Sequence, residues 1–246
     1  MADAGDRGQP VRLPWWPKEH GASREPLRQA QIVATAIKLI DAEGLDGLSM
    51  RRLGQELSVG PMSIYGHVRN KDELIDLVLD EIAAEVRLDD DPSAPWRSRV
   101  AFVAREIRAM LRRHRHLAPL AGARISMGPN SLRIIEHLMS IVREAGFDGT
   151  RLTFAFAAII NFAIGTAIMD GRGLTGPATK GKTDEELQAM VFGMYAALPR
   201  DQFPNLVRFI PETDVEGVDE DAQFEYALQL ILDGLEVDLA RTQSDL

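Results

Sequence analysis

The strongest constraint on the fold is a pair of short helical segments separated by a three-residue turn, within residues 49–67. The first segment follows Ser49, a residue type that caps helix N-termini, and ends near Leu57. The turn spans residues 58–60, and Pro61 suits the first position of the next helix. This spacing is typical of a helix-turn-helix, although two short helices of a larger bundle would also fit the spacing alone.

Helical periodicity extends over the rest of the chain, and no segment alternates as a half-buried strand does. An apolar face begins at Leu27, and Gly44 stands where this first helix would stop. Further helices are predicted at residues 50–57, 61–66, 71–88, 95–113, 129–145, 150–170, 184–197 and 219–240. The chain is therefore predicted to be all-α.

The formal net charge of −9 would disfavour a DNA partner if it were evenly spread, because affinity for duplex DNA comes largely from Lys and Arg. The charge is not evenly spread. Residues 1–71 contain ten Lys or Arg and eight Asp or Glu, so the acidity belongs to the C-terminal part. The N-terminal part is therefore compatible with DNA binding.

Side chains that could support catalysis or hold a metal are sparse. The chain has no cysteine, which excludes disulfides and thiolate ligands. His114 and His116 are two positions apart and would point to different sides of a helix, so we expect solvated histidines rather than a metal site. No nucleophile with an oriented base stands out, so neither an enzyme nor a cofactor is expected.

Residues 64–71 read Ile-Tyr-Gly-His-Val-Arg-Asn-Lys, which matches the Ile-Tyr-x-His-Val-x-Asn-Lys stretch of the tetracycline-repressor (TetR) family. Residues 28–88 as a whole resemble the DNA-binding domain of this family, including the glycine-ended first helix. The resemblance implies an N-terminal three-helix DNA-binding domain with a helix-turn-helix, rather than a plain bundle. We expect a flexible N-terminal arm at residues 1–26, followed by the DNA-binding domain at residues 27–88.

A recognition helix presents its N-terminal residues to base edges in the major groove, so Met62, Ser63 and Gly66 are expected nearest the bases. The resemblance places at the DNA the residues Ser49, Arg51, Pro61, Met62, Ser63, Tyr65, His67 and Lys71. The side chains with donors for phosphate oxygens are Arg51, Tyr65, His67 and Lys71. Where this chain has Gly66 the tetracycline repressor has a bulky aromatic residue, so a contact would be missing and the operator sequence should differ.

Residues 152–169 form an apolar run without charged residues that is long enough to cross a membrane. Asn161 and two threonines weaken that interpretation, and one such segment in an amphipathic helical chain is more typical of a helix buried on every side. Small residues in the run would let another helix approach closely, and residues 224–239 supply a second long apolar face. We expect these two helices to form the core of a homodimer, without a membrane partner.

The C-terminal part, residues 89–246, resembles the helical ligand-binding and dimerisation domain of the tetracycline-repressor subgroup. The resemblance implies a cavity lined, by position, by Val103, Ile107, Leu138, Phe156 and Ile160. All five are apolar, which predicts an apolar or aromatic small-molecule effector; an ordinary core without a void is the alternative. The approximate matches to the subgroup's drug-binding and magnesium-binding positions are apolar, so magnesium-tetracycline is not expected.

Together these features predict a ligand-responsive transcriptional regulator, by default a repressor. It would bind a palindromic double-stranded DNA operator as a homodimer and be released by its effector. The first residues lack the features of a secretory signal, so a cytoplasmic location is expected. An architectural DNA-binding protein without an effector would share the N-terminal motif and differ only in the regulatory part.

Overall fold

The computed structural model describes residues 25–88, 91–124, 126–170, 182–212 and 219–244, and every regular element in these ranges is helical. Nearly all of the predicted N-terminal arm lies outside them. In chain order the elements are α1 (Glu25–Glu43), the 3₁₀ helix η1 (Leu45–Gly47), α2 (Met50–Glu56), α3 (Pro61–Tyr65), α4 (Lys71–Ala83), α5 (Trp96–Arg113), α6 (Ala118–Ala123), α7 (Pro129–Glu144), α8 (Gly149–Asp170), α9 (Asp184–Ala196), α10 (Pro204–Glu212) and α11 (Glu220–Ser244).

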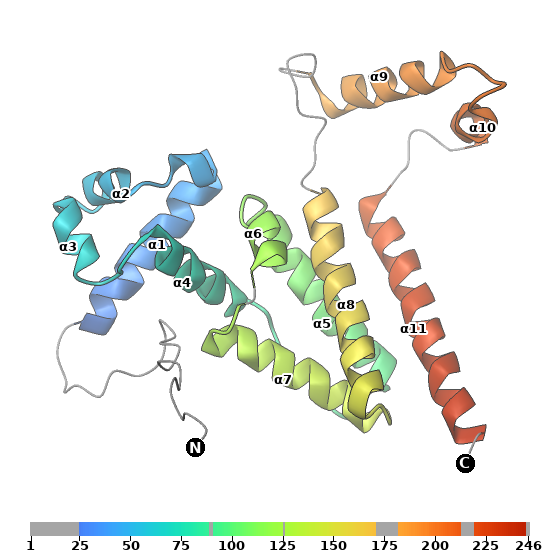
Figure 1. Ribbon diagram of the computed structural model, residues 1–246, viewed down its shortest axis with the longest axis horizontal. Helices are drawn as coiled ribbons and strands as arrows, with labels where there is room; N and C mark the ends of the chain where they lie inside the picture. The colour runs from blue at the N-terminus through green and yellow to red at the C-terminus, as the bar shows by residue number, and fades with distance from the viewer. Residues whose placement is uncertain (1–24, 89–90, 125, 171–181, 213–218, 245–246) are drawn as a thin grey trace, which may run out of the picture.

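The first three α-helices form a small unit at the end of the molecule opposite α11 (Figure 1). Leu53 of α2 and Ile64 of α3 are fully buried, as are Leu48 and Val68, which flank the pair. Burying side chains of this size stabilises the unit by roughly 2 kcal/mol each. Because α2 and α3 are both anchored on their inner sides, their outer sides are free to face another molecule.

Local sequence signals set the geometry of the turn between α2 and α3. The hydroxyl of Ser49 accepts a hydrogen bond from the backbone N–H of Arg52 at 3.1 Å, which confirms the predicted helix cap. Gly54 lets the chain return closely over α2, because a Cβ at this position would lie 2.8 Å from the carbonyl oxygen of Val59. The two short helices are therefore held at a fixed angle.

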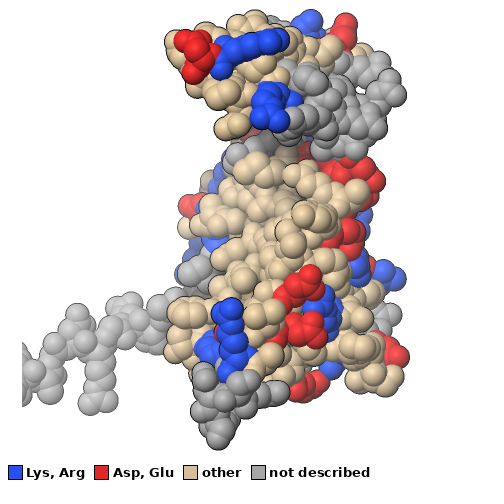
Figure 2. Space-filling model, turned by 90° about the vertical axis from the view of Figure 1, so that its right-hand side faces the viewer, with Lys and Arg blue, Asp and Glu red and all other residues tan. Residues whose placement is uncertain are grey.

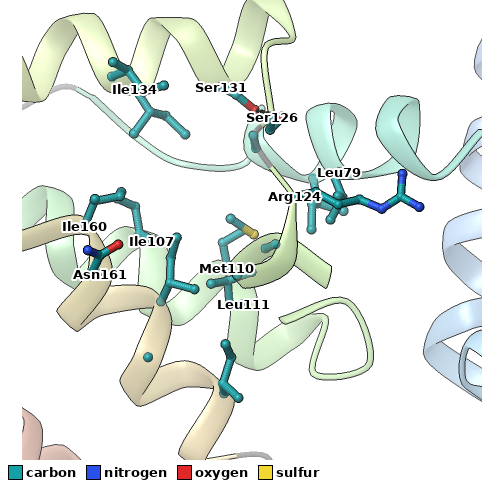
Figure 3. Close-up of a pocket in the computed structure, with 18 of the residues that line it drawn as sticks. Leu79, Ile107, Met110, Leu111, Arg124, Ser126, Ser131, Ile134, Ile160 and Asn161 are labelled. Carbon is teal, nitrogen blue, oxygen red and sulfur yellow. Dashed lines mark hydrogen bonds between the residues drawn. The ribbon is translucent and has the colours of Figure 1, made fainter. Parts of the chain in front are cut away.

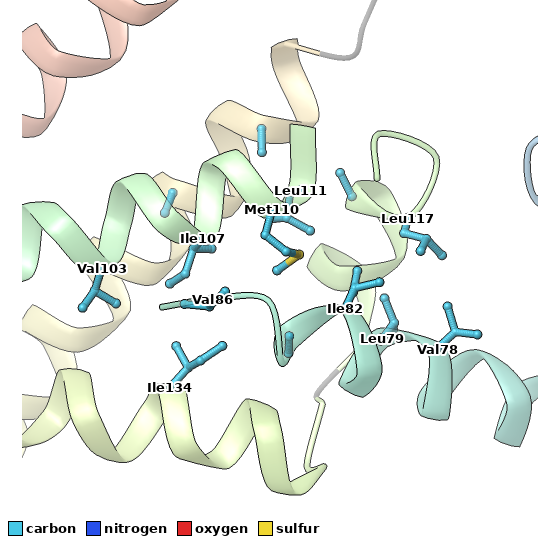
Figure 4. Close-up of a cluster of buried hydrophobic side chains, with 14 of the residues drawn as sticks. Val78, Leu79, Ile82, Val86, Val103, Ile107, Met110, Leu111, Leu117 and Ile134 are labelled. Atoms are coloured by element: carbon cyan, nitrogen blue, oxygen red, sulfur yellow. The ribbon is translucent and has the colours of Figure 1, made fainter. Parts of the chain in front are cut away.

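Helix α4 belongs to two hydrophobic cores. Its N-terminus is capped by Asn70, whose side chain accepts a hydrogen bond from the N–H of Glu73 at 2.8 Å, and it packs on α1. Its C-terminal half enters the next core, where Val78 and Ile82 lie in one buried cluster with side chains of α5 and α7 (Figure 4). A displacement of α4 would therefore change the packing of both cores.

Helix α5 is the centre of the C-terminal part, and it packs against α7 and α8. Val103 and Leu111 on its inner side are fully buried. Trp96 at the start of α5 packs edge to face against Phe147, with ring centroids 6.3 Å apart. The two helices α6 and α10 were not predicted, because six and nine residues give little periodicity to detect.

The apolar helix α8 is not buried on every side, so that prediction is wrong for the single subunit. Ile159 and Ala163 are fully buried against the body of the subunit, whereas 67% of Phe154 is exposed. Helix α8 has the length and composition of a membrane span, although core helices of other proteins share both properties. Helix α11 packs beside it, and Phe162 stacks on Phe224 with centroids 5.1 Å apart. One apolar face of α8 remains open.

Arginines of α5 attach the acidic helix α11. The guanidinium of Arg108 is buried, lies 4.5 Å from the centroid of the Phe224 ring, and donates to Asp221 and Asp170 at 2.7 Å each. The further pairs along this seam are Arg97 with Asp233 and Glu236, Arg105 with Glu225, and Arg112 with Asp221. Part of the acidity of the C-terminal region is thus compensated within the subunit.

Candidate DNA-binding surface and effector cavity

The outer side of α3 is exposed, as a helix that meets a ligand must be. Ile64 anchors this helix in the core, whereas 80% of Met62 is exposed. The other predicted contact residues that are exposed on or near α2 and α3 are Ser49, Arg51, Pro61, Ser63, Tyr65 and Gly66. The predicted base-reading positions are therefore exposed, as are two of the four predicted phosphate-contacting residues, Arg51 and Tyr65.

Lys71 has a structural contact that the sequence did not indicate. Its ammonium group donates to the carbonyl oxygens of Leu48 at 2.7 Å and Leu45 at 3.2 Å, and the side chain is half-buried. Two of its three N–H donors therefore hold the segment before Ser49, which leaves one for a phosphate. His67 is also half-buried.

The basic side chains around this surface differ in their engagement. Arg52 pairs with Glu43 and Glu56 at 3.0 Å each, and the hydrogen bond and charge of Glu43 raise the pKa of the Arg52 guanidinium. Arg69 pairs with Glu73 at 3.0 Å. Within the described part of the chain no ion pair is found for Arg51, so its charge is the one most available to a phosphate.

A cavity of about 520 Å³ lies between α4, α5, α6, α7 and α8 (Figure 3). This volume suits a small organic ligand. Ile107, Phe156 and Ile160, which were predicted to line a cavity, do line it. Val103 and Leu138 do not: both are fully buried in the surrounding core, because helical spacing predicts burial without distinguishing a packed neighbour from a void.

The cavity also has polar residues that sequence reasoning did not place there: Arg124, Ser126, Ser131 and Asn161. The two serine hydroxyls hydrogen-bond to each other at 2.7 Å (Figure 3). Asn161 lies on α8, on the other side of the cavity. The signal for it was available, since an amide interrupts the otherwise apolar run of that helix.

Three carboxylates of α4, spaced four residues apart, bind the segment between α6 and α7, which borders the cavity. Arg124 donates to Asp72 at 2.5 Å and to Asp76 at 2.9 Å, and its hydrogen bond to Asp72 raises the pKa of the guanidinium. Asp80 is buried and accepts from the backbone N–H of Ser131 at 3.0 Å and from the Asn130 amide at 3.2 Å. The cavity wall and α4 are therefore directly connected.

No group of His, Asp and Glu residues able to hold a metal ion occurs among the described residues. One of the two histidines expected to be solvated is nevertheless buried: His114 exposes only 8% of its surface. Its partners are two carboxylates rather than water, because the fold brings Asp41 and Glu85 to it from distant parts of the sequence.

Comparisons with known proteins agree with this architecture. The family model "Bacterial regulatory proteins, tetR family" matches residues 32–78, and "Tetracyclin repressor-like, C-terminal domain" matches residues 89–239. The HTH-type transcriptional repressor DrrR1 of Streptomyces coeruleorubidus is 32% identical over 98% of this chain and 90% of its own length.

A solved structure of the TetR family protein ActR of Streptomyces coelicolor, in complex with actinorhodin, superposes with a TM-score of 0.73. It is 35% identical and covers 86% of this chain and 97% of its own. ActR in complex with (S)-DNPA has the same TM-score and 34% identity. These relatives are regulators and not enzymes, as the sequence predicted. The chain therefore belongs to the TetR family of DNA-binding transcriptional regulators.

Proposed function

We propose that the protein is a repressor that binds a palindromic operator as a homodimer and leaves it when a small apolar or aromatic effector enters the cavity. The observation that supports this most is the exposed outer side of α3, which carries Met62 and Ser63 and packs against α2, where Arg51 is exposed. In a two-fold dimer these surfaces would enter successive major grooves about 34–36 Å apart. Selection of duplexes from a random pool, followed by footprinting, tests for a palindrome.

The open face of α8 and α11 supports the homodimer. Its large exposed apolar side chains are Phe154, Met169, Tyr226, Leu230 and Val237. Figure 2, which views the molecule from the side of α11, shows a broad area there without charged side chains. Exposed large apolar side chains within an uncharged area are typical of an interface between protein chains. A second copy would cover the apolar face that α8 leaves open.

The character of the cavity supports an effector with a largely apolar body. Apolar side chains, among them Phe156 and several isoleucines, provide most of its wall, and Asn161 offers a side-chain amide at one side. The related regulator ActR is known in complex with actinorhodin, so this compound is a suitable first probe. We expect actinorhodin to raise the melting temperature of the protein and to release it from DNA; an architectural protein would show neither change.

The connection from cavity to DNA would pass through α4. An effector that shifts the loop after Arg124 would alter the contacts of Asp80 with the start of α7, and α4 would move with them. Because α4 also packs on α1, this movement would change the separation of the two α3 helices in a dimer. DNA release then follows from the effector's preference for one of two conformations.

Arg51→Ala and Ser63→Ala should separate positioning from sequence reading. Arg51→Ala is expected to weaken binding to operator and random duplex alike and to reduce the salt slope by about one, because it removes a phosphate contact. Ser63→Ala should change the preferred sequence instead, since Ser63 is exposed at the start of α3. Titrations on both duplexes at several salt concentrations measure this, and equal effects of both variants would contradict the division of roles.

Asn161→Leu should weaken the binding of actinorhodin by about two- to tenfold, because one hydrogen bond to the ligand is lost while the shape of the cavity is retained. Operator affinity without ligand should be unchanged, since Asn161 lies far from α3 (Figures 1 and 3). Calorimetry and DNA titration measure the two quantities. Unchanged ligand affinity would exclude Asn161 as a contact.

A further inference from the structure

The two parts of the molecule meet at His114, the residue that ends α5. Its Nδ1 lies 2.9 Å from Oδ2 of Asp41 on α1, and its Nε2 lies 2.9 Å from Oε1 of Glu85, just after α4. The imidazole is buried, whereas both carboxylates are partly exposed. A single side chain of the regulatory part thus contacts two separate segments of the DNA-binding part, and we call this contact the Asp41–His114–Glu85 bridge.

The bridge requires a particular protonation state. A neutral imidazole has one N–H donor, and its other nitrogen is an acceptor that would face a carboxylate oxygen unfavourably. Only the imidazolium form donates to Asp41 and Glu85 together. Burial alone would raise the pKa of Glu85, but hydrogen bonds from His114 and Arg113 outweigh it, so the pKa lies below the ordinary value and this partner stays ionised.

The other charged groups nearby do not replace this contact. Arg113, also on α5, donates to the second oxygen of Glu85 at 2.8 Å, and among the described residues no ion pair between it and α1 is found. His116, in the following turn, faces Gly44 at the end of α1. In the described part of the chain His114 is therefore the group that joins α1, the end of α4 and the end of α5 at one point.

We propose that His114 is a positioning residue for DNA binding: its imidazolium form fixes α1 and the end of α4 on the regulatory domain, so that operator affinity depends on pH. The proposal rests on the proposed function as a DNA-binding switch. The imidazolium is the form that makes both contacts, so the bridge is favoured in mildly acidic solution and is lost as the pH rises. Its loss gives the DNA-binding domain more freedom relative to α5.

Urea unfolding of the full-length protein tests the bridge without DNA. His114→Gln keeps a side chain with one amide donor group but cannot titrate, and His116→Gln is the matched control in the same turn. We expect the wild type to exceed His114→Gln in stability more at about pH 6 than at about pH 8, because the imidazolium is the form that makes both contacts. His116→Gln should follow the wild type. Parallel profiles for wild type and His114→Gln would overturn the proposal.

Binding to the selected operator duplex tests the positioning role. From about pH 6 to about pH 8 the operator affinity of the wild type should fall by about fivefold or more relative to the operator affinity of His114→Gln. His67 near α3 is present in both proteins, so its contribution cancels in the comparison. If the stability profiles differ but the operator profiles coincide, the bridge is only a fold contact and the proposal is wrong. Failure of the wild type to select any duplex at any pH would instead refute the proposed function.

Discussion

Phe154→Glu is expected to convert the protein into a monomer and to reduce its affinity for a full palindromic operator by about 100-fold or more. Among the described large apolar residues of α8, Phe154 is the most exposed, and the partner helix of the proposed dimer would bury its side chain. A carboxylate in this position would lose its hydration without gaining a partner. Monomers bind the two half-sites independently. They therefore lose the affinity gained from linked binding, which is on the order of 10²–10⁴-fold.

Sedimentation and DNA titration measure the two effects of Phe154→Glu. Leu132→Glu on α7 is a matched control, because it introduces the same charge at an exposed apolar residue outside α8 and α11. This control should remain a dimer with wild-type affinity. A monomeric Phe154→Glu protein that binds the full operator as tightly as the wild type would contradict the proposed arrangement.

Gly128→Ala should lower operator affinity by about tenfold or more without any ligand. Gly128 precedes α7, and a Cβ there would overlap the carboxyl group of Asp80 on α4. Asp80 is buried and held by the backbone N–H of Ser131 at 3.0 Å, so it has little room to turn aside. Either α4 or the start of α7 must shift, and a shift of α4 moves the DNA-binding helices.

A compensating change distinguishes this mechanism from general damage. Asp80→Ser removes most of the group that the new methyl would meet, so the Gly128→Ala, Asp80→Ser double variant should regain part of the operator affinity lost in Gly128→Ala. Gly193→Ala on α9 is the neutral control, since nothing described lies within 4 Å of a Cβ there. Wild-type affinity of Gly128→Ala would mean that the cavity wall and α3 are not coupled through α4.

The helix-turn-helix was predictable because its determinants are close together in sequence. Ser49 caps the helix that begins at the next residue by accepting from the N–H of Arg52, and Pro61 starts the next helix immediately after the turn. Such signals need no knowledge of the rest of the fold. The ammonium contacts of Lys71 were not predictable, because the carbonyl groups that it binds lie 23 and 26 residues earlier in the chain.

The regulatory part was harder to predict from the sequence, because its residues too meet partners that lie far away along the chain. Val103 and Ile107 are both apolar, both on α5 and both buried, yet only Ile107 borders the cavity. Helical spacing decides which side of a helix faces inward, whereas a void depends on the side chains of four other helices. His114 lacked any local sign of burial, since Asp41 and Glu85 reach it only in the folded chain.

Helix α4 bears on how hybrid regulators should be assembled. Its first half completes the three-helix unit, and its acidic side chains at Asp72, Asp76 and Asp80 fit Arg124 and the start of α7. A chimera joined just after α4 would separate these carboxylates from their donors, whereas one joined between α3 and α4 would keep those contacts but part α4 from the α1 on which it packs. Exchanging α4 together with the segment from Arg124 to Ser131 keeps these contacts intact. These two segments should therefore be transferred together when the DNA-binding domain is joined to a different regulatory domain.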